Sequence, residues 1–217
     1  MNAKPAFVFD AYGTLFNVHA AIARHRAQAG PEAQRFSEIW RTKQLEYTWT
    51  LTLADRYIDF WTLTERALDY AFNCVSTVDR ALRSKLLEAY LKLDIYPDAA
   101  VALANLKSLG HRTAILSNGT PDMLNAAVTA SGIADALDVV LSVDKLRLYK
   151  PRPEVYRLAA DALAAKPTDT MFISSNRWDV MGAASFGFKT YWVNRTRVPD
   201  EYGELRPFRE IFDLASL

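Results

Sequence analysis

The chain of 217 residues contains a single cysteine, Cys74. One thiol cannot form a disulfide within the chain, and the paired cysteines or clustered histidines of zinc sites are lacking too. Long apolar stretches are also missing. The N-terminal run AFVF ends at Asp10, too early for a signal peptide, and no uncharged stretch approaches the roughly 20 residues that span a bilayer. We therefore expect a cytoplasmic protein with no membrane partner, in which Cys74 is a small buried hydrophobic side chain.

Net charge is almost absent, because 26 basic residues stand against 25 acidic ones. A net charge of +1 is too small for the field of the whole molecule to recruit nucleic acid, so we expect no such partner. The sequence has no G-x-G-x-x-G motif, so a dinucleotide is not indicated and we expect no organic cofactor. What is present is a globular composition, 50% hydrophobic and 24% charged, sufficient to bury a core.

Short apolar runs alternate with helical patterns over much of the chain. Strands buried on both faces read as such runs, and their alternation with helices predicts an α/β fold with a doubly wound parallel sheet. Helices are expected from Pro97 to Gly110, after Pro153, and from Trp178 to Phe186. The expected strands are Ala6–Phe9, Thr113–Leu116, Leu137–Leu141, Met171–Ile173 and Thr190–Val193.

A long insertion separates the first two expected strands. About 100 residues follow Asp10 before Thr113, whereas a crossover needs only about 10 to 12. The inserted stretch has helical periodicity throughout and no convincing strand. We therefore expect an α/β core formed by residues 1–16 and 97–217, with a helical cap over residues 17–96.

Polar residues follow the expected strands directly. In open α/β sheets, ligands bind outside the carboxyl ends of the strands, so these residues are expected to converge on one site. They are Asp10, Ser117, Asn118, Lys150, Ser174, Ser175, Asn176 and Asp179.

Four segments, FVFDAYGTLF, LSNG, YKP and SSNRWDVMGA, occur in an order and at separations that resemble the four motifs of the haloacid dehalogenase superfamily. Within it, FDAYGTLF, SSNRWD and the cap segment WRTKQLEYTW are similar to those of the (S)-2-haloacid dehalogenases. The resemblance implies a hydrolase that converts short (S)-2-haloacids to (R)-2-hydroxyacids through a covalent aspartyl ester and releases halide. It also implies a homodimer whose partners are otherwise only the haloacid and halide.

Asp10 would be the nucleophile in this reaction. The side chain of an aspartate in water has a pKa of about 3.9, so it is ionised at neutral pH and needs no base to attack. The alternative from the residues alone is an aspartate that caps the amides of its own loop.

Tyr12 distinguishes two branches of the superfamily. The phosphatases resemble one another in having a second aspartate at this position, which acts as general acid and helps to bind magnesium, and a further acid where this chain has Asn176. Tyrosine supplies no such ligand, so we expect no metal. Two alternatives stay open: a phosphatase or phosphonate hydrolase of the same fold, and a non-catalytic module that binds small acids.

The resemblance assigns further roles. It implies that Arg41, Asn118 and Trp178 receive the halide, and that Tyr12, Leu45, Phe60 and Trp178 line an apolar pocket. Ser117 would bind the substrate carboxylate, amides after Asp10, at Ala11, would stabilise an oxyanion, and Thr14, Ser174 and Asn176 would surround Asp10 and its water. Lys150 would lie between Asp10 and Asp179, with Tyr156 in the same catalytic set.

Each of these residues also has a plainer interpretation. Arg41 could pair on the surface with Glu38, and the aromatic side chains, Tyr156 included, could simply fill the core. Lys150 could belong to a solvated basic loop, and Ser117, Ser174 and Asn176 could be loop caps.

Overall fold

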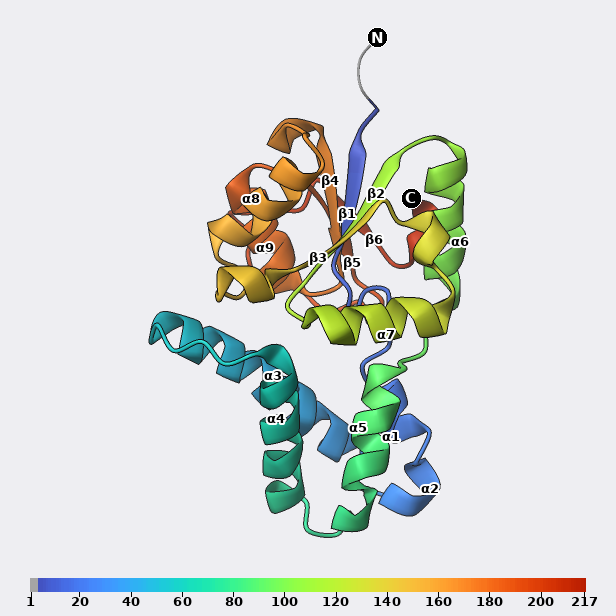
Figure 1. The fold of residues 1–217 in the computed structure, drawn as a ribbon, viewed down its shortest axis with the longest axis vertical. Coiled ribbons are helices and arrows are strands. Elements are labelled where there is room, and N and C mark those ends of the chain that lie inside the picture. The colour runs from blue at the N-terminus through green and yellow to red at the C-terminus, as the bar shows by residue number, and fades with distance from the viewer. Residues whose placement is uncertain (1–3) are drawn as a thin grey trace.

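The protein, described from a computed structural model over residues 4–217, is built on one six-stranded sheet (Figure 1). Every neighbouring pair of strands is parallel, and their order is β3-β2-β1-β4-β5-β6. The expected α/β class with a parallel sheet is confirmed. The strands are β1 Ala6–Phe9, β2 Arg112–Ser117, β3 Val139–Ser142, β4 Thr170–Ser174, β5 Lys189–Val193 and β6 Arg209–Ile211.

Two strands differ from expectation. β6 was not expected at all, because Arg209 and Glu210 are exposed and only Ile211 is buried, so this edge strand has no continuous apolar run. β3 begins at Val139 rather than Leu137, since a short 3₁₀ helix, Ala134–Ala136, precedes it and Leu137 is the residue that caps the end of that helix. Apolar composition therefore located the central strands better than the edges.

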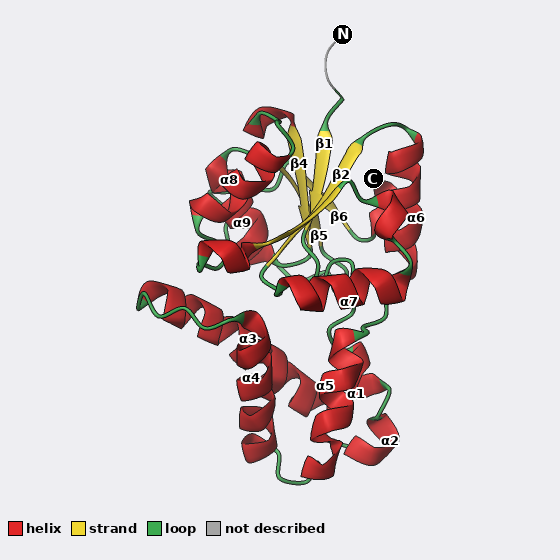
Figure 2. Cartoon of the chain, in the orientation of Figure 1, coloured by secondary structure: helices red, strands yellow, loops and turns green. Residues whose placement is uncertain are grey.

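Helices cover both faces of the sheet, with α6 on one side and α8 and α9 on the other (Figures 1 and 2). Three of them begin with proline, whose fixed φ suits the first helical turn. Gly132 and Gly187 end α7 and α9 in the left-handed conformation. The helices are α6 Pro97–Ser108, α7 Pro121–Ser131, α8 Pro153–Ala162 and α9 Arg177–Phe186, and the other 3₁₀ helices are Arg80–Leu82, Val143–Leu146, Pro167–Asp169 and Leu214–Ser216.

The remaining helices form a separate group beyond the carboxyl ends of the strands (Figure 1). The long helix α3 packs along α4, whose N-terminus is capped by Asp59 accepting a hydrogen bond from the amide of Thr62. The group comprises α1 Ala20–Ala23, α2 Arg26–Ala29, α3 Ala33–Leu53, α4 Phe60–Cys74 and α5 Arg83–Leu91.

The chain crosses between the two groups at two adjacent segments. The amide of Asn17 donates to the carbonyl of Asp94 over 2.9 Å, and the amide of Tyr96 donates to Leu15 over 2.8 Å. An isolated antiparallel bridge pairs Phe16 with Ile95. These crossings are where we propose that the inserted cap, residues 17–96, begins and ends.

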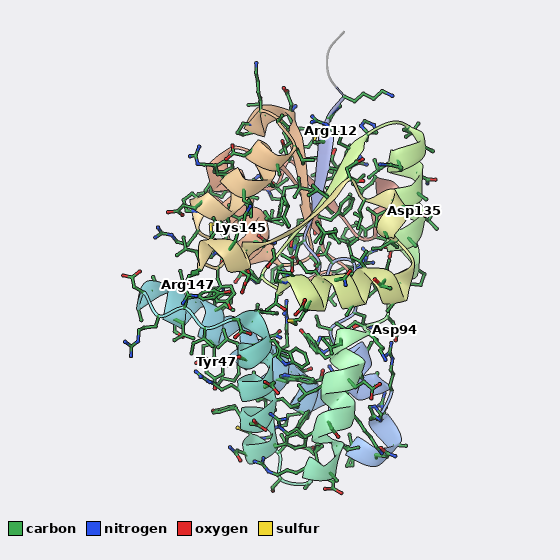
Figure 3. All side chains as sticks on the ribbon, viewed as in Figure 1. Tyr47, Asp94, Arg112, Asp135, Lys145 and Arg147 are labelled. Carbon is green, nitrogen blue, oxygen red and sulfur yellow. The ribbon has the colours of Figure 1, made fainter. Side chains whose placement is uncertain are left out.

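The surface shows one expectation to be wrong. Cys74 is exposed rather than buried, because it is the last residue of α4 and lies beyond the stripe that packs into the core. Charged side chains lie exposed on the surface, as Figure 3 shows for Asp94, Lys145 and Arg147. Within residues 4–217, no helix has the length and apolar character needed to cross a membrane.

Candidate active site

The polar residues that follow the strands converge at the carboxyl edge of the sheet. Asp10 follows the central strand β1, and its amide donates to Ile173 of β4 over 2.9 Å. Asp10 is 6% exposed, and its carboxylate contacts side chains from two other segments, Lys150 from one and Ser174 with Asn176 from the other. The doubly wound topology therefore brings together residues that lie more than 160 positions apart.

Side-chain donors hold both oxygens of Asp10. Oδ2 accepts hydrogen bonds from Thr14 Oγ1 at 3.0 Å and Asn176 Nδ2 at 2.7 Å, with Ser174 Oγ at 3.4 Å. Oδ1 accepts from Lys150 Nζ at 3.0 Å. Within residues 4–217, no backbone amide of its own loop donates to this carboxylate, so Asp10 is not the loop cap that its sequence position also allowed.

Lys150 lies between two buried carboxylates. Its Nζ, in a side chain only 1% exposed, also donates to Asp179 Oδ2 at 2.7 Å. Burial disfavours the ammonium, but the charges of Asp10 and Asp179 outweigh it and raise the pKa of Lys150. The lysine therefore stays charged at neutral pH and does not belong to a solvated loop.

Asp179 is the most deeply buried acid of the group, at 0% exposure. Burial raises its pKa to about 6, although Lys150 acts in the opposite direction. Tyr156 donates to its Oδ1 over 2.8 Å, and burial raises the pKa of that phenol well above its usual value. A carboxyl with a pKa near neutrality can accept a proton from water and release it again.

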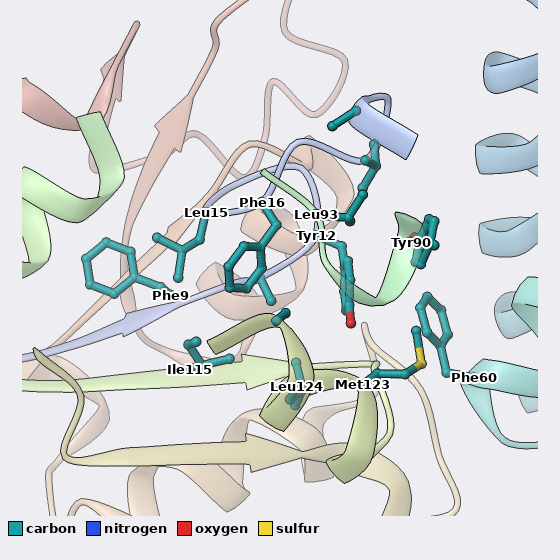
Figure 4. Close-up of a cluster of buried hydrophobic side chains, with 14 of the residues drawn as sticks. Phe9, Tyr12, Leu15, Phe16, Phe60, Tyr90, Leu93, Ile115, Met123 and Leu124 are labelled. Carbon is teal, nitrogen blue, oxygen red and sulfur yellow. The ribbon is translucent and has the colours of Figure 1, made fainter. Parts of the chain in front are cut away.

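Tyr12 forms an apolar wall where the cap meets the sheet (Figure 4). Its ring stacks on Tyr90 at 5.7 Å between centroids and lies 5.9 Å from Phe60. A Cβ added to Gly119 would come within 2.7 Å of the Tyr12 ring, so only glycine fits there. Burial raises the pKa of Tyr12 well above its usual value, which keeps the phenol neutral.

The residues around Asp10 do not fit a divalent cation. Such an ion needs several oxygen ligands, whereas Lys150, Thr14 and Asn176 all present hydrogen-bond donors to Asp10. The carbonyl of Tyr12 also accepts from Asn176 Nδ2 at 3.2 Å. In the part of the chain that the structure describes, no three acidic, histidine or cysteine side chains are grouped to hold a metal ion.

Arg41 reaches from α3 of the cap to the loop after β1. It is half-buried, and its Nη2 donates to the Tyr12 carbonyl at 3.1 Å while Nη1 donates to Gln44 Oε1 at 2.8 Å. The surface pair with Glu38 does not form, and that carboxylate accepts from Gln34 instead. Arg41 therefore places a cation at the boundary between the cap and the sheet.

Two other residues expected in the pocket, Leu45 and Trp178, are half-buried. Leu45 lies about one helical turn after Arg41 on α3. The Trp178 ring packs edge-on against Trp49, with centroids 5.3 Å apart. A largely apolar cavity of about 350 Å³ adjoins the site here, lined by Trp49, Thr52, Leu53, Lys150, Pro151, Arg152, Trp178, Met181 and Tyr202.

Three more expected residues lie around the end of β2 and the start of the loop after β1. Ser117 is fully buried and its Oγ accepts from the amide of Gly119 at 3.1 Å, whereas Asn118 Oδ1 accepts from the amide of Lys150 at 3.1 Å. Ala11 is also buried, and within residues 4–217 its amide donates no hydrogen bond. That amide is therefore free to donate to a bound oxygen.

Sequence reasoning missed two residues of this site. Gln44 contacts Arg41, and Tyr90 stacks on Tyr12. Ser175, expected after β4, donates to the carbonyl of Gly13 over 2.6 Å. Gln44 could have been found from its spacing, because residues three apart share a helix face. Nothing local distinguishes Tyr90, whose position depends on how α5 packs.

The chain belongs to the haloacid dehalogenase-like hydrolases, whose family model matches residues 4–187. The family resemblance of the four motifs is thereby confirmed. The chain is 46% identical to (S)-2-haloacid dehalogenase 1 of Pseudomonas sp. (strain CBS-3), over 100% of this chain and 96% of that protein.

Solved structures agree with this assignment. A crystal structure of a dehalogenase superposes with a TM-score of 0.96 at 44% identity, covering 100% of this chain and 96% of the other. The L-2-haloacid dehalogenase of Xanthobacter autotrophicus, solved with chloropropionic acid covalently bound, superposes with a TM-score of 0.86 at 36% identity, covering 99% and 96%.

Proposed function

We propose that this protein hydrolyses short (S)-2-haloacids to (R)-2-hydroxyacids and releases halide. The observation that carries the proposal is the carboxylate of Asp10, held by Lys150, Thr14 and Asn176, with the guanidinium of Arg41 hydrogen-bonded to the carbonyl of Tyr12, two residues further along the same loop. The full-length similarity to a curated (S)-2-haloacid dehalogenase supports it. So does the relative that carries chloropropionic acid as a covalent adduct.

In the first step, an oxygen of Asp10 attacks the carbon that bears the halogen, from the side opposite the carbon–halogen bond. The carbon–oxygen bond forms as the carbon–halogen bond breaks, and the halide leaves with the bonding electrons toward Arg41, Asn118 and Trp178. Arg41 suits this role because a guanidinium keeps its charge at any working pH. The product is an alkyl ester of Asp10, with the carbon inverted.

In the second step, water attacks the carbonyl carbon of that ester. Asp179 accepts the proton from water, because its pKa of about 6 makes it a base at neutral pH, while Lys150 and Tyr156 hold it in place. The free amide of Ala11 stabilises the oxyanion. Cleavage of the acyl–oxygen bond leaves the chiral carbon untouched, and Asp179 returns its proton to the departing alkoxide, which becomes the hydroxyacid. The carboxyl of Asp10 then loses the second proton of the water to solvent, which regenerates the nucleophile.

The remaining residues position the substrate. Tyr12, Leu45 and Phe60 form apolar walls against the alkyl group, and Ser117 binds the substrate carboxylate. Thr14, Ser174 and Asn176 keep Asp10 oriented and retain the water. We further propose that the enzyme is a cytoplasmic homodimer that uses no metal or organic cofactor, which light scattering and metal analysis would test.

Isotope labelling from solvent tests whether a covalent ester of Asp10 forms during the reaction. In a single turnover in H₂¹⁸O with enzyme in excess, the label should enter Asp10 and not the hydroxyl of the product. Label in the product after that first turnover would contradict the covalent step. The Asp10→Asn variant should remain folded and release no halide.

The alternatives make different predictions in the same assay. A phosphatase or phosphonate hydrolase would release phosphate from p-nitrophenyl phosphate and lose activity in EDTA, whereas halide release from (S)-2-chloropropionate should be unchanged by EDTA. A non-catalytic module would release no halide from any member of a broad haloacid panel.

A further inference from the structure

Arg41 has only neutral partners. Its two hydrogen bonds go to the carbonyl of Tyr12 and to Gln44 Oε1, and among residues 4–217 no carboxylate forms a salt bridge with it. The acids on its own helix bond elsewhere: Glu38 accepts from Gln34, and Glu46 pairs with Lys43. The positive charge of the guanidinium is therefore held in place without being neutralised.

Gln44 has a fixed orientation at the centre of this arrangement. It is 1% exposed, and its Nε2 donates to Thr64 Oγ1 at 2.6 Å. The Thr64 hydroxyl donates its hydrogen to the carbonyl of Phe60, at 2.7 Å, so toward the side-chain amide of Gln44 its oxygen can only accept. The amide oxygen must then face Arg41, at 2.8 Å, and it also accepts from the Tyr90 hydroxyl, at 3.0 Å.

We propose that Gln44 is a positioning residue that aims Arg41 at the departing halide while leaving its charge free. A carboxylate at this position would hold the guanidinium as well, but it would cancel the charge that stabilises the halide. The neutral amide oxygen of Gln44, whose two lone pairs accept from Arg41 and Tyr90, holds the guanidinium in place without cancelling its charge. The proposal rests on the proposed function, in which Arg41 receives the halide.

The Gln44→Glu variant tests the proposal, because it exchanges an amide for a carboxylate of the same shape. We expect kcat for (S)-2-chloropropionate to fall about tenfold or more, a smaller effect than the loss of a whole transition-state donor. For (S)-2-bromopropionate the fall should be smaller, since bromide is the better leaving group and needs less stabilisation. The inhibition constant of bromide as a product should rise, because the new carboxylate neutralises the charge of Arg41 at the halide site.

Two further variants separate charge from structure. Gln34→Glu makes the same change at an exposed position of the same helix and should leave both rates and bromide inhibition unchanged. Gln44→Met removes the acceptor without adding charge, so it should lower kcat for (S)-2-chloropropionate and kcat for (S)-2-bromopropionate by similar factors. Circular dichroism and urea unfolding of each variant show whether the fold is retained.

The outcomes are distinct. A chloride-to-bromide rate ratio in Gln44→Glu within twofold of wild type, with unchanged bromide inhibition, would overturn the inference and leave the proposed function standing. If Gln44→Glu fails to fold, Gln44→Met decides the question. The inference is overturned if Gln44→Met, which adds no charge, changes the ratio of the chloropropionate and bromopropionate rates as strongly as the added carboxylate was expected to. Wild-type protein that releases no halide from either substrate would overturn the proposed function itself, and this inference with it.

Discussion

Replacing Lys150 by methionine removes the one cation that joins two buried carboxylates. Lys150 Nζ lies 3.0 Å from Asp10 Oδ1 and 2.7 Å from Asp179 Oδ2, and neither acid side chain is more than 8% exposed. Removing one partner of a buried ion pair typically costs about 3–5 kcal/mol, because the remaining charge is left uncompensated. Since a whole domain is stabilised by only about 5–15 kcal/mol, this is a large share of the free energy of unfolding.

The cost should depend on pH in a definite direction. Burial and the charge of Asp10 raise the pKa of Asp179, and without Lys150 nothing of opposite charge counters them, so the folded variant takes up a proton that the unfolded chain, with a carboxyl pKa of about 3.9, does not bind at pH 5. Stability of the variant therefore rises on acidification. The wild-type lysine, whose pKa is raised, contributes fully below its unfolded value of 10.5 and loses this contribution only at higher pH.

Urea unfolding at pH 5 and pH 8, followed by circular dichroism, measures this effect. We expect a loss of about 3–5 kcal/mol at pH 8 and a clearly smaller loss at pH 5. Lys107→Met is the matched control, because Lys107 pairs with Asp138 at the surface and should contribute at most about 1 kcal/mol. A Lys150→Met variant that is no less stable than this control, or equally destabilised at both pH values, would refute the reasoning.

Two other predictions follow from the same site. The rate of ester hydrolysis, measured by rapid quench in a single turnover, should fall about tenfold per pH unit below pH 6, because Asp179, with a pKa of about 6, must be ionised to act as the base; a profile flat to pH 4.5 would contradict that role. Gly182→Ala should lower the free energy of unfolding by about 1–3 kcal/mol and reduce the rate, because the added Cβ clashes with the Tyr156 hydroxyl that holds Asp179. Gly203→Ala, with open space around it, should change neither thermal stability nor rate.

The central part of the fold could be predicted from the sequence because it depends on local composition. Strands buried on both faces must be apolar throughout, so β1, β2, β4 and β5 were recognisable from their residues alone. The residues directly after these strands had to meet at one edge, which is a property of parallel topology. The sixth strand could not be found in this way, since an edge strand with exposed Arg209 and Glu210 carries no such pattern.

The sequence by itself determined the chemical types at the site: an aspartate after the first strand, a lysine and a second aspartate later, and a tyrosine where a metal ligand could have been. Only the tertiary structure decided their environment. The pKa of Asp179 depends on burial and on Lys150, and the free charge of Arg41 depends on Gln44 and Thr64, which come from two different cap helices. Burial and long-range hydrogen bonds arise from packing between distant segments, and no local pattern encodes them.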